Sequence, residues 1–183
     1  MRALVLLVLA SALAGCAADP PASTPPPALD ATLRPIDVAP DAALAEEVVY
    51  PDAFSLADAT PAWASSAELA DWGLVEAARR VIDLPNGSRV ESGAFVFATR
   101  EQASRVLAAI DATYEAENGS WSRRPDPRAG DRSTLYRLAD AGVDAYVANV
   151  RSGSVVFQVS ALGPLVTEEH VAGWARALAA RLA

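Results

Sequence analysis

The segment from residue 89 to residue 119 most limits the folds open to this chain, because a strand pattern runs directly into an amphipathic helix pattern. Residues 89–99 read RVESGAFVFAT and end with apolar residues on both faces, as expected for a strand beneath a helix. Thr99 then begins a helix, and Gln102 completes a capping box. The helix carries a single apolar stripe, formed by Ala103, Val106, Leu107, Ile110 and Tyr114. Asn118-Gly119 is expected to end this helix, so the segment indicates a helix packed on a sheet.

A hairpin is predicted immediately before this strand. Asn86-Gly87 lies between two runs rich in Val, Ile and Phe, which is a strong hairpin signal. The first run, residues 74–84, also fits one face of a helix, because Leu74, Ala77, Ala78 and Val81 have helical spacing. We favour a strand in its second half.

Three further strands and a second helix are expected towards the C-terminus. The strands are 134–138, 145–150 and 154–161, with a tight turn at Ser152-Gly153 between the last two. The last strand alternates apolar and polar residues, which indicates one buried and one wet face. Thr167 then caps a final helix. Its apolar stripe is Val171, Trp174, Ala175, Leu178 and Leu182.

The two strand-and-helix units resemble each other in sequence. Residues 92–97 are similar to residues 152–157, and both helices begin at a threonine with the same stripe spacing. The chain is therefore either two related halves or a coincidence of amphipathic patterns. Both alternatives give the same fold class. It is an α+β two-layer sandwich over residues 73–183, with an antiparallel sheet of about five strands, two amphipathic helices on one face and the order ββαβββα.

The N-terminus reads as an export signal. Ala3 to Ala14 is an apolar run behind a single Arg2, too short for a transmembrane helix, which takes about 20 residues. The following motif, Leu13-Ala14-Gly15-Cys16, resembles the lipobox of bacterial lipoprotein precursors. This resemblance implies that residues 1–15 are a signal peptide and that Cys16 receives a diacylglyceryl lipid, which contacts the membrane. Because Ala17 is not the aspartate of inner-membrane lipoproteins, the resemblance favours the periplasmic side of the outer membrane in a cell with two membranes.

The mature chain is predicted to begin with a tether. Residues 16–40 hold the lipidated Cys16 and seven of the 13 prolines, a composition that favours disorder. As an extended, polyproline-like chain, residues 17–40 would reach about 75 Å from end to end. Residues 41–72 are expected to form a lead-in segment around the domain, as a short helix or strand with loops.

Composition excludes several kinds of chemistry. All 15 basic residues are arginine, and Cys16 is the only cysteine, so lysine and cysteine nucleophiles are ruled out. His170 is the only histidine, so the usual zinc sites cannot form, and we expect no metal and no cofactor. The net charge of −8 argues against nucleic acid as a partner. No nucleotide-binding or hydrolase motif occurs, and we expect no enzyme activity.

The strongest candidate site is a loop at residues 120–133. It contains an exposed-looking tryptophan and four guanidinium groups, which could bind an anion or a sugar. These candidate ligand residues are Trp121, Arg123, Arg124, Arg128 and Arg132. The alternative is a solvated loop in which the arginines pair with Asp126 and Asp131.

Three other polar residues receive structural interpretations. His170 is read as a surface histidine, because no nucleophile stands beside it. Asp140 and Asp144 flank a glycine-containing turn and are read as turn residues, not calcium ligands.

The layout of the mature chain resembles small bacterial envelope lipoproteins and extracytoplasmic sensor-like modules. The shared features are Phe95-x-Phe97, the helix opening at Thr99, Gly130-Asp131-Arg132 with Tyr136, the hairpin at Ser152-Gly153 and the closing helix. The resemblance transfers no site residues. The leading hypothesis is a non-catalytic binding or interaction domain of unknown ligand, with a protein, an anion or a sugar as the candidate partners. A structural or assembly factor of an envelope complex is the alternative, and an enzyme using carboxylates ranks third.

Overall fold

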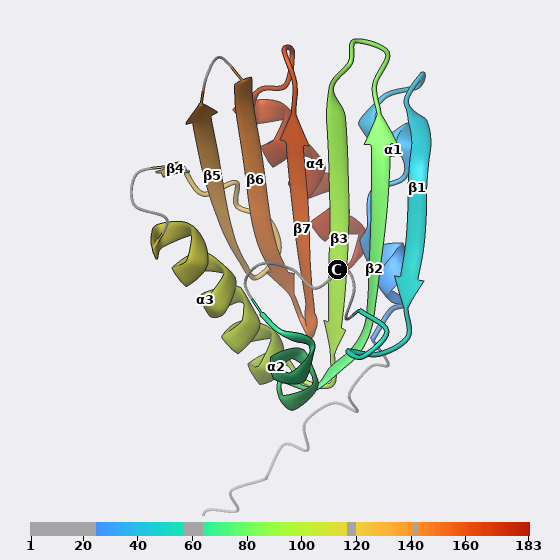
Figure 1. The fold of residues 1–183 in the computed structure, drawn as a ribbon, viewed down its shortest axis with the longest axis vertical. Coiled ribbons are helices and arrows are strands. Elements are labelled where there is room, and N and C mark those ends of the chain that lie inside the picture. Colours follow the sequence, from blue (N-terminus) through green and yellow to red (C-terminus); the bar gives the residue numbers. More distant parts are fainter. Residues whose placement is uncertain (1–24, 57–63, 117–119, 141–142) are drawn as a thin grey trace, which may run out of the picture.

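One antiparallel sheet of seven strands organises the molecule (Figure 1). The computed structural model describes residues 25–56, 64–116, 120–140 and 143–183. The strand order is β1-β2-β3-β7-β6-β5-β4, so the first and second halves of the chain meet where β3 pairs with β7. The strands are β1 (Ala43–Tyr50), β2 (Leu74–Asp83), β3 (Arg89–Phe97), β4 (Trp121–Arg124), β5 (Arg132–Asp140), β6 (Val143–Ser152) and β7 (Val155–Leu162). The helices are the 3-10 helix η1 (Ala28–Ala31) and α1 (Pro35–Val38), α2 (Ser66–Asp71), α3 (Arg100–Ala116) and α4 (Glu168–Arg181).

The α+β class and the predicted hairpins are confirmed. Residues 74–83 form a strand, which resolves the ambiguity with a helix, and Gly87 takes the positive φ of 81° that its turn requires. Gly153 has a φ of 58° in the turn between β6 and β7. Both helix caps are present, because Gln102 N donates to Thr99 Oγ1 at 3.2 Å and His170 N donates to Thr167 Oγ1 at 3.3 Å.

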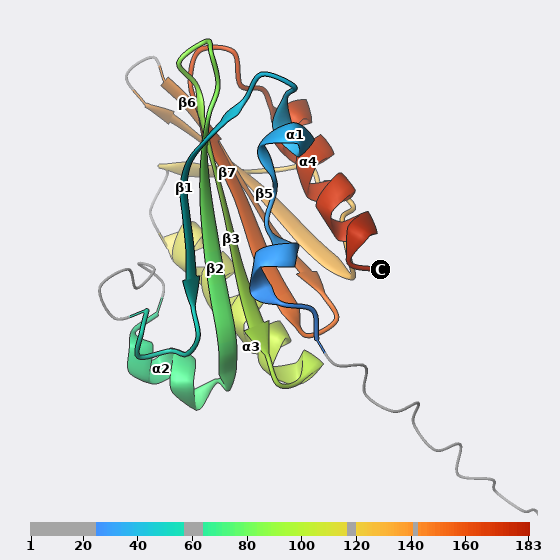
Figure 2. The ribbon, with the colours of Figure 1, turned by 90° about the vertical axis from the view of Figure 1, so that its right-hand side faces the viewer.

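The prediction that both long helices cover one face of the sheet is wrong. Phe95 and Phe97 of β3 pack in one cluster with α3, while Ala94 and Val96 face the opposite side and belong to the α4 cluster. Figure 2 shows α3 and α4 on opposite sides of the sheet. The apolar residues on both faces of β3 therefore reflect two covering layers, not one. The two strand-and-helix units place their helices on opposite faces of the sheet.

The sheet has two strands more than the five expected. Strand β1 lies in the lead-in segment and β4 in the predicted loop at residues 120–133. Both are edge strands in the strand order, and neither buries an alternating apolar face. Their sequences, ALAEEVVY and WSRR, consequently lack the period-two signal on which the prediction depended.

The predicted disorder of the tether is wrong for residues 25–40. This segment, which we name the strap, runs beside α4 on the same face of the sheet (Figure 2). Ala28, Ala31 and Leu33 are buried in the main core, and Leu33 N donates to Ser92 Oγ of β3 at 3.0 Å. Side chains of the sheet form hydrogen bonds with backbone N–H and carbonyl groups of this proline-rich segment, so the strap is ordered although it forms no strand of its own. Cys16 and the predicted signal peptide lie outside the described residues, as do residues 117–119 with the predicted helix stop.

Within the described ranges, no helix is long and apolar enough to span a bilayer.

Candidate functional site

The five residues of the predicted ligand site do not converge on one point. Arg123 pairs with Glu115 of α3 at 3.0 Å, and Arg124 pairs with Glu168 of α4 at 2.7 Å, because neighbouring residues of β4 point to opposite faces. Arg132 lies 3.8 Å from Asp111. The partners are thus residues of the two helices, not the Asp126 and Asp131 expected for a solvated loop.

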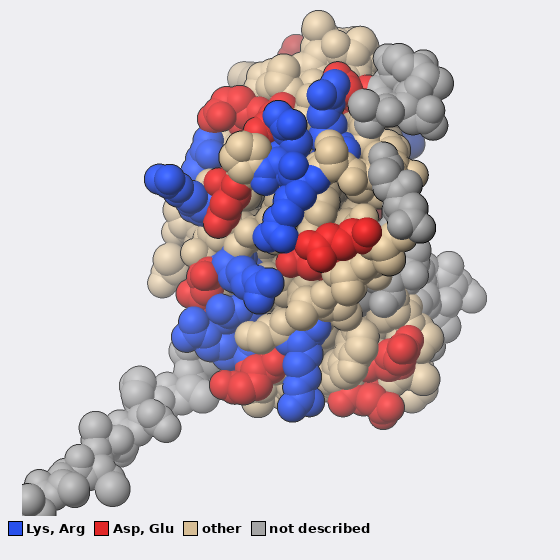
Figure 3. Space-filling view, turned by 90° about the vertical axis from the view of Figure 1, so that its left-hand side faces the viewer, with Lys and Arg blue, Asp and Glu red and all other residues tan. Residues whose placement is uncertain are grey.

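Basic and acidic side chains are interspersed on this side of the molecule. Figure 3 shows arginines alternating with acidic residues over the side formed by α3 and β4. Arg128 differs from the other three arginines of the predicted site, because its guanidinium makes no hydrogen bond or ion pair with any described residue. Whether these side chains bind a ligand stays a prediction.

Trp121 belongs to a cluster of aromatic rings beside α3. Its ring meets Tyr114 edge to face at a centroid distance of 5.0 Å, and Tyr114 stacks on Tyr136, also at 5.0 Å. Tyr136 OH donates to Glu115 Oε1 at 3.4 Å. Burial, together with the charges of Asp111 and Glu115, raises the pKa of Tyr136, so its hydroxyl stays protonated at neutral pH. The cluster fixes the Trp121 ring at one edge of the open sheet face.

A groove of about 310 Å³ runs from this aromatic cluster across the sheet. In Figure 1, α3 crosses the lower left of the front face, and the upper parts of β3 and β7 lie clear of it. The groove is walled by Tyr114 and Trp121 and floored by polar and apolar side chains of β3, β6 and β7. Residues of its floor and far side include Arg89, Glu91, Val147, Gln158, Ser160 and Leu162. We name this feature the aromatic groove.

The charged residues of the aromatic groove are already neutralised. Arg89 Nε lies 2.8 Å from Asp83 Oδ1, and Arg79 forms an ion pair with Glu91, with Nε 2.9 Å from Oε1. Gln158 Nε2 donates to Tyr114 OH at 3.1 Å, which holds an amide group against the aromatic wall. The groove therefore presents ring faces, an amide and hydroxyl groups, with little net charge.

A buried polar cluster supports this wall beneath α3. Asp111 is 5% exposed, and its Oδ1 accepts from Thr134 Oγ1 at 2.6 Å. Its Oδ2 and Asn149 Nδ2 each lack a hydrogen bond within the described structure. Burial raises the pKa of Asp111, against the lowering effects of the Thr134 hydrogen bond and of the charges of Arg132 and Arg123. This carboxyl is closed to solvent, so it cannot act on a substrate in the groove.

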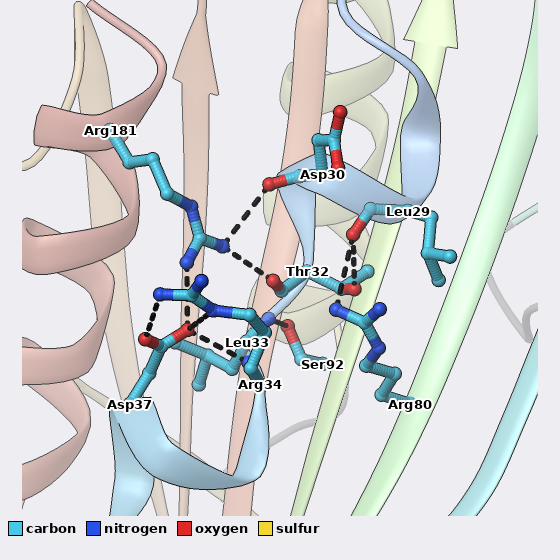
Figure 4. A network of polar contacts seen from close by, with 9 residues as sticks. All are labelled: Leu29, Asp30, Thr32, Leu33, Arg34, Asp37, Arg80, Ser92 and Arg181. Carbon is cyan, nitrogen blue, oxygen red and sulfur yellow. Dashed lines mark hydrogen bonds and ion pairs between the residues drawn. The ribbon is translucent and has the colours of Figure 1, made fainter.

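A second cavity, of about 510 Å³, lies where the strap meets α4. Arg34, Arg80 and Arg181 line it, and Figure 4 shows their contacts. Arg181 donates to Asp37 Oδ2 at 2.7 Å and to the Thr32 carbonyl at 2.6 Å. Arg34 also pairs with Asp37, at 2.8 Å.

These contacts give the strap cavity a structural role. Burial alone would raise the pKa of Asp37, but hydrogen bonds from Arg34 and Arg181 outweigh it and hold the pKa well below its usual range. Arg80 pairs with Glu47 at 2.7 Å and donates to the Leu29 carbonyl at 3.3 Å. Because each guanidinium has a carboxylate or carbonyl partner, the arginines fasten the strap to β2 and α4.

The remaining candidates are placed as structural residues. His170 is exposed and stacks on Trp174 at a centroid distance of 5.8 Å. Asp144 pairs with Arg137 at 2.7 Å, and Asp140 ends β5, its side chain lying outside the described parts. No group of three or more histidine, cysteine or acidic residues able to hold a metal occurs in the ranges that the structure describes.

Comparison with known proteins identifies a shared fold. No protein-family model matches the sequence, and no curated protein is significantly similar to it. Among solved structures, the chain is similar to the extracellular domain of PknH from Mycobacterium tuberculosis, with a TM-score of 0.59 and 13% sequence identity. The match covers 83% of this chain and 92% of that domain. At this identity the likeness shows that the two domains share a fold.

Proposed function

We propose that this protein is a non-catalytic binding domain on the outer side of a membrane, held there by a lipid on Cys16. The aromatic groove is its binding site. The observation that carries the proposal is the wall formed by Tyr114 and Trp121 beside the Gln158 amide, on a part of the sheet face that no helix of the described residues covers. The shared fold with an extracellular domain supports the location, together with the lipobox resemblance at residues 13–16.

The chemistry of the groove favours an uncharged, hydroxyl-rich ring, such as a sugar. Aromatic faces pack against the apolar face of a sugar, while amide and hydroxyl groups of a pocket fix its orientation. A free anion is disfavoured because Arg89 is already paired with Asp83 at 2.8 Å. An enzyme is disfavoured because Asp111, the carboxyl with a raised pKa, is sealed under α3.

Isothermal titration calorimetry with N-acetylglucosamine trimer tests the proposal. Wild type should bind saturably, and Trp121→Ala should weaken binding by about tenfold or more, because buried aromatic anchors dominate such sites. Trp121→Phe keeps a ring face and should retain part of the affinity. Phe54→Ala removes an aromatic ring that is 71% exposed and lies outside the groove, and should change nothing. Equal affinity of Trp121→Ala and wild type, or no saturable binding, would contradict the proposal.

Assembly with another envelope protein is the second candidate. It rests on β1, an eight-residue edge strand on which Leu44 and Val49 are 47% and 43% exposed. An open edge of this length can pair with an added strand. Sedimentation of the purified chain with its co-isolated envelope proteins tests this candidate, and Val49→Lys should release any partner bound at the edge.

A further inference from the structure

A third cavity, separate from the aromatic groove, lies where four parts of the chain meet. It has a volume of about 610 Å³ and shares no lining residue with the groove. Its walls come from the start of α3, residues 128–131, the turn between β6 and β7, and the end of α4. Arg100, Arg128 and Arg176 line it, with Asp131 as the one acidic residue. We name it the basic cavity.

The positive charges of the basic cavity exceed its negative charge. Asp131 is already engaged, since its Oδ2 accepts from Arg151 Nη1 at 3.0 Å and from Gly153 N at 2.9 Å. Arg100 approaches the same oxygen at only 3.5 Å. The partner of Arg176 is Glu169, whose side chain is 82% exposed, so water screens that pair.

Arg128 is held towards the cavity by a preformed turn. Its φ of 56° makes it the one residue other than glycine with a positive φ in the described chain. Asp126 Oδ1 accepts from Arg128 N at 2.7 Å, and Ser133 Oγ accepts from Ala129 N at 3.0 Å. Strained backbone of this kind persists where surrounding contacts fix it, and it is enriched at binding sites.

The close packing of Gly130 fixes the same turn. Gly130 has a φ of 58°, and a Cβ added there would come within 2.5 Å of the Arg151 carbonyl oxygen. Asp131 N donates to that carbonyl at 2.8 Å. The turn thus costs little further ordering on binding, while the guanidinium of Arg128 makes no hydrogen bond or ion pair with the described residues.

We infer that the basic cavity binds a phosphate group, free or as an ester. Guanidinium forks pair with phosphate oxygens through two parallel hydrogen bonds, and a phosphate monoester carries about two negative charges near neutral pH. Three arginines around one cavity match a dianion better than a single carboxylate. The contrast with the strap cavity supports this assignment, because its arginines are all paired.

The test uses the full mature chain in nonionic detergent at fixed ionic strength. Isothermal titration with inorganic phosphate and with glycerol 3-phosphate should show one saturable site. Arg128→Gln should weaken it by about tenfold or more, the usual effect of losing a charge-assisted hydrogen bond. Arg105→Gln is the matched control: it removes another exposed arginine, on α3, that has no partner within the described structure and lies outside the cavity.

Two results would overturn the inference. One is the absence of saturable phosphate binding. The other is an equal loss of affinity in Arg128→Gln and Arg105→Gln, which would show a general effect of charge. Mixed micelles containing phosphatidic acid, a phosphate monoester, with phosphatidylcholine micelles for comparison, identify the source of the phosphate. Tighter binding of phosphatidic acid than of glycerol 3-phosphate assigns a lipid headgroup, and the reverse assigns a soluble ester; either order upholds the phosphate site.

Discussion

At the scale of single residues, long-range pairing decides what each polar side chain does. Arg124 and Glu168 are 44 positions apart, and Arg132 and Asp111 are 21 apart, so no local pattern links them. The sequence shows which segment is rich in arginine, but Trp121, which was expected to be exposed, is half-buried against Tyr114. The sequence did not predict that α3 and α4 supply the counter-charges, because this requires knowing which helix lies on which face.

Asp111→Asn isolates the effect of the buried carboxyl. A pKa raised on folding means that the ionised group opposes folding at neutral pH, and that this cost disappears as the pH falls through the folded pKa. An asparagine can still accept from Thr134 without carrying a charge. We therefore expect Asp111→Asn to leave the free energy of unfolding at pH 7 unchanged or to raise it by up to about 1 kcal/mol.

Urea denaturation at pH 7 and pH 4.5 measures this effect. Any gain of Asp111→Asn should shrink at the lower pH, where the wild-type carboxyl begins to protonate. Glu101→Gln, an exposed acid in the first turn of the same helix, should differ from wild type by no more than about 0.5 kcal/mol. A variant clearly less stable at pH 7 than at pH 4.5, relative to wild type, would show that the ionised Asp111 stabilises the fold.

At the scale of elements, periodicity predicted the helices and central strands but not their covering layers. The stripe from Ala103 to Tyr114 is buried against the sheet, apart from the half-buried Tyr114. The face that each helix covers depends on the connection between strands, which periodicity does not record. The strap was missed for another reason: its order comes from Ser92 and Arg181, which are remote in sequence.

Leu33→Ala tests the role of the strap. Leu33 is 1% exposed in the main core, so its truncation should lower the free energy of unfolding by about 2–5 kcal/mol. Ile36→Ala, three residues away in the same strap, removes a side chain that is 65% exposed and should cost far less. Equal, small effects in chemical denaturation would mean that the strap does not contribute to the core.

At the scale of the whole molecule, the order of the strap shortens the link that the proposed lipid on Cys16 would leave between the domain and a membrane. The chain from Cys16 to residue 25 spans nine peptide units, which reach about 30 Å at most when fully extended. The 24 residues first assigned to the tether would have reached about 75 Å. A domain anchored at Cys16 is therefore kept close to the membrane surface.

Cys16→Ser tests the anchoring. Without the thiol no diacylglyceryl group can be attached, so we expect unprocessed precursor of higher mass and no lipid-modified form. Intact-mass spectrometry of the envelope fraction distinguishes the two, with wild type expected to begin at a lipid-modified Cys16. Normal processing and membrane retention of Cys16→Ser would remove the basis for the lipid anchor.

The central claim is that the aromatic groove is a ligand site, and nuclear magnetic resonance tests it most directly. On addition of N-acetylglucosamine trimer to isotope-labelled protein, we expect the largest chemical-shift changes at the Trp121 indole N–H and the Gln158 side-chain amide. Signals of Leu33 in the strap and of Arg181 at the end of α4, both outside the groove, should stay constant. Shifts confined to residues outside the groove, or no shifts at saturating trimer, would contradict the account.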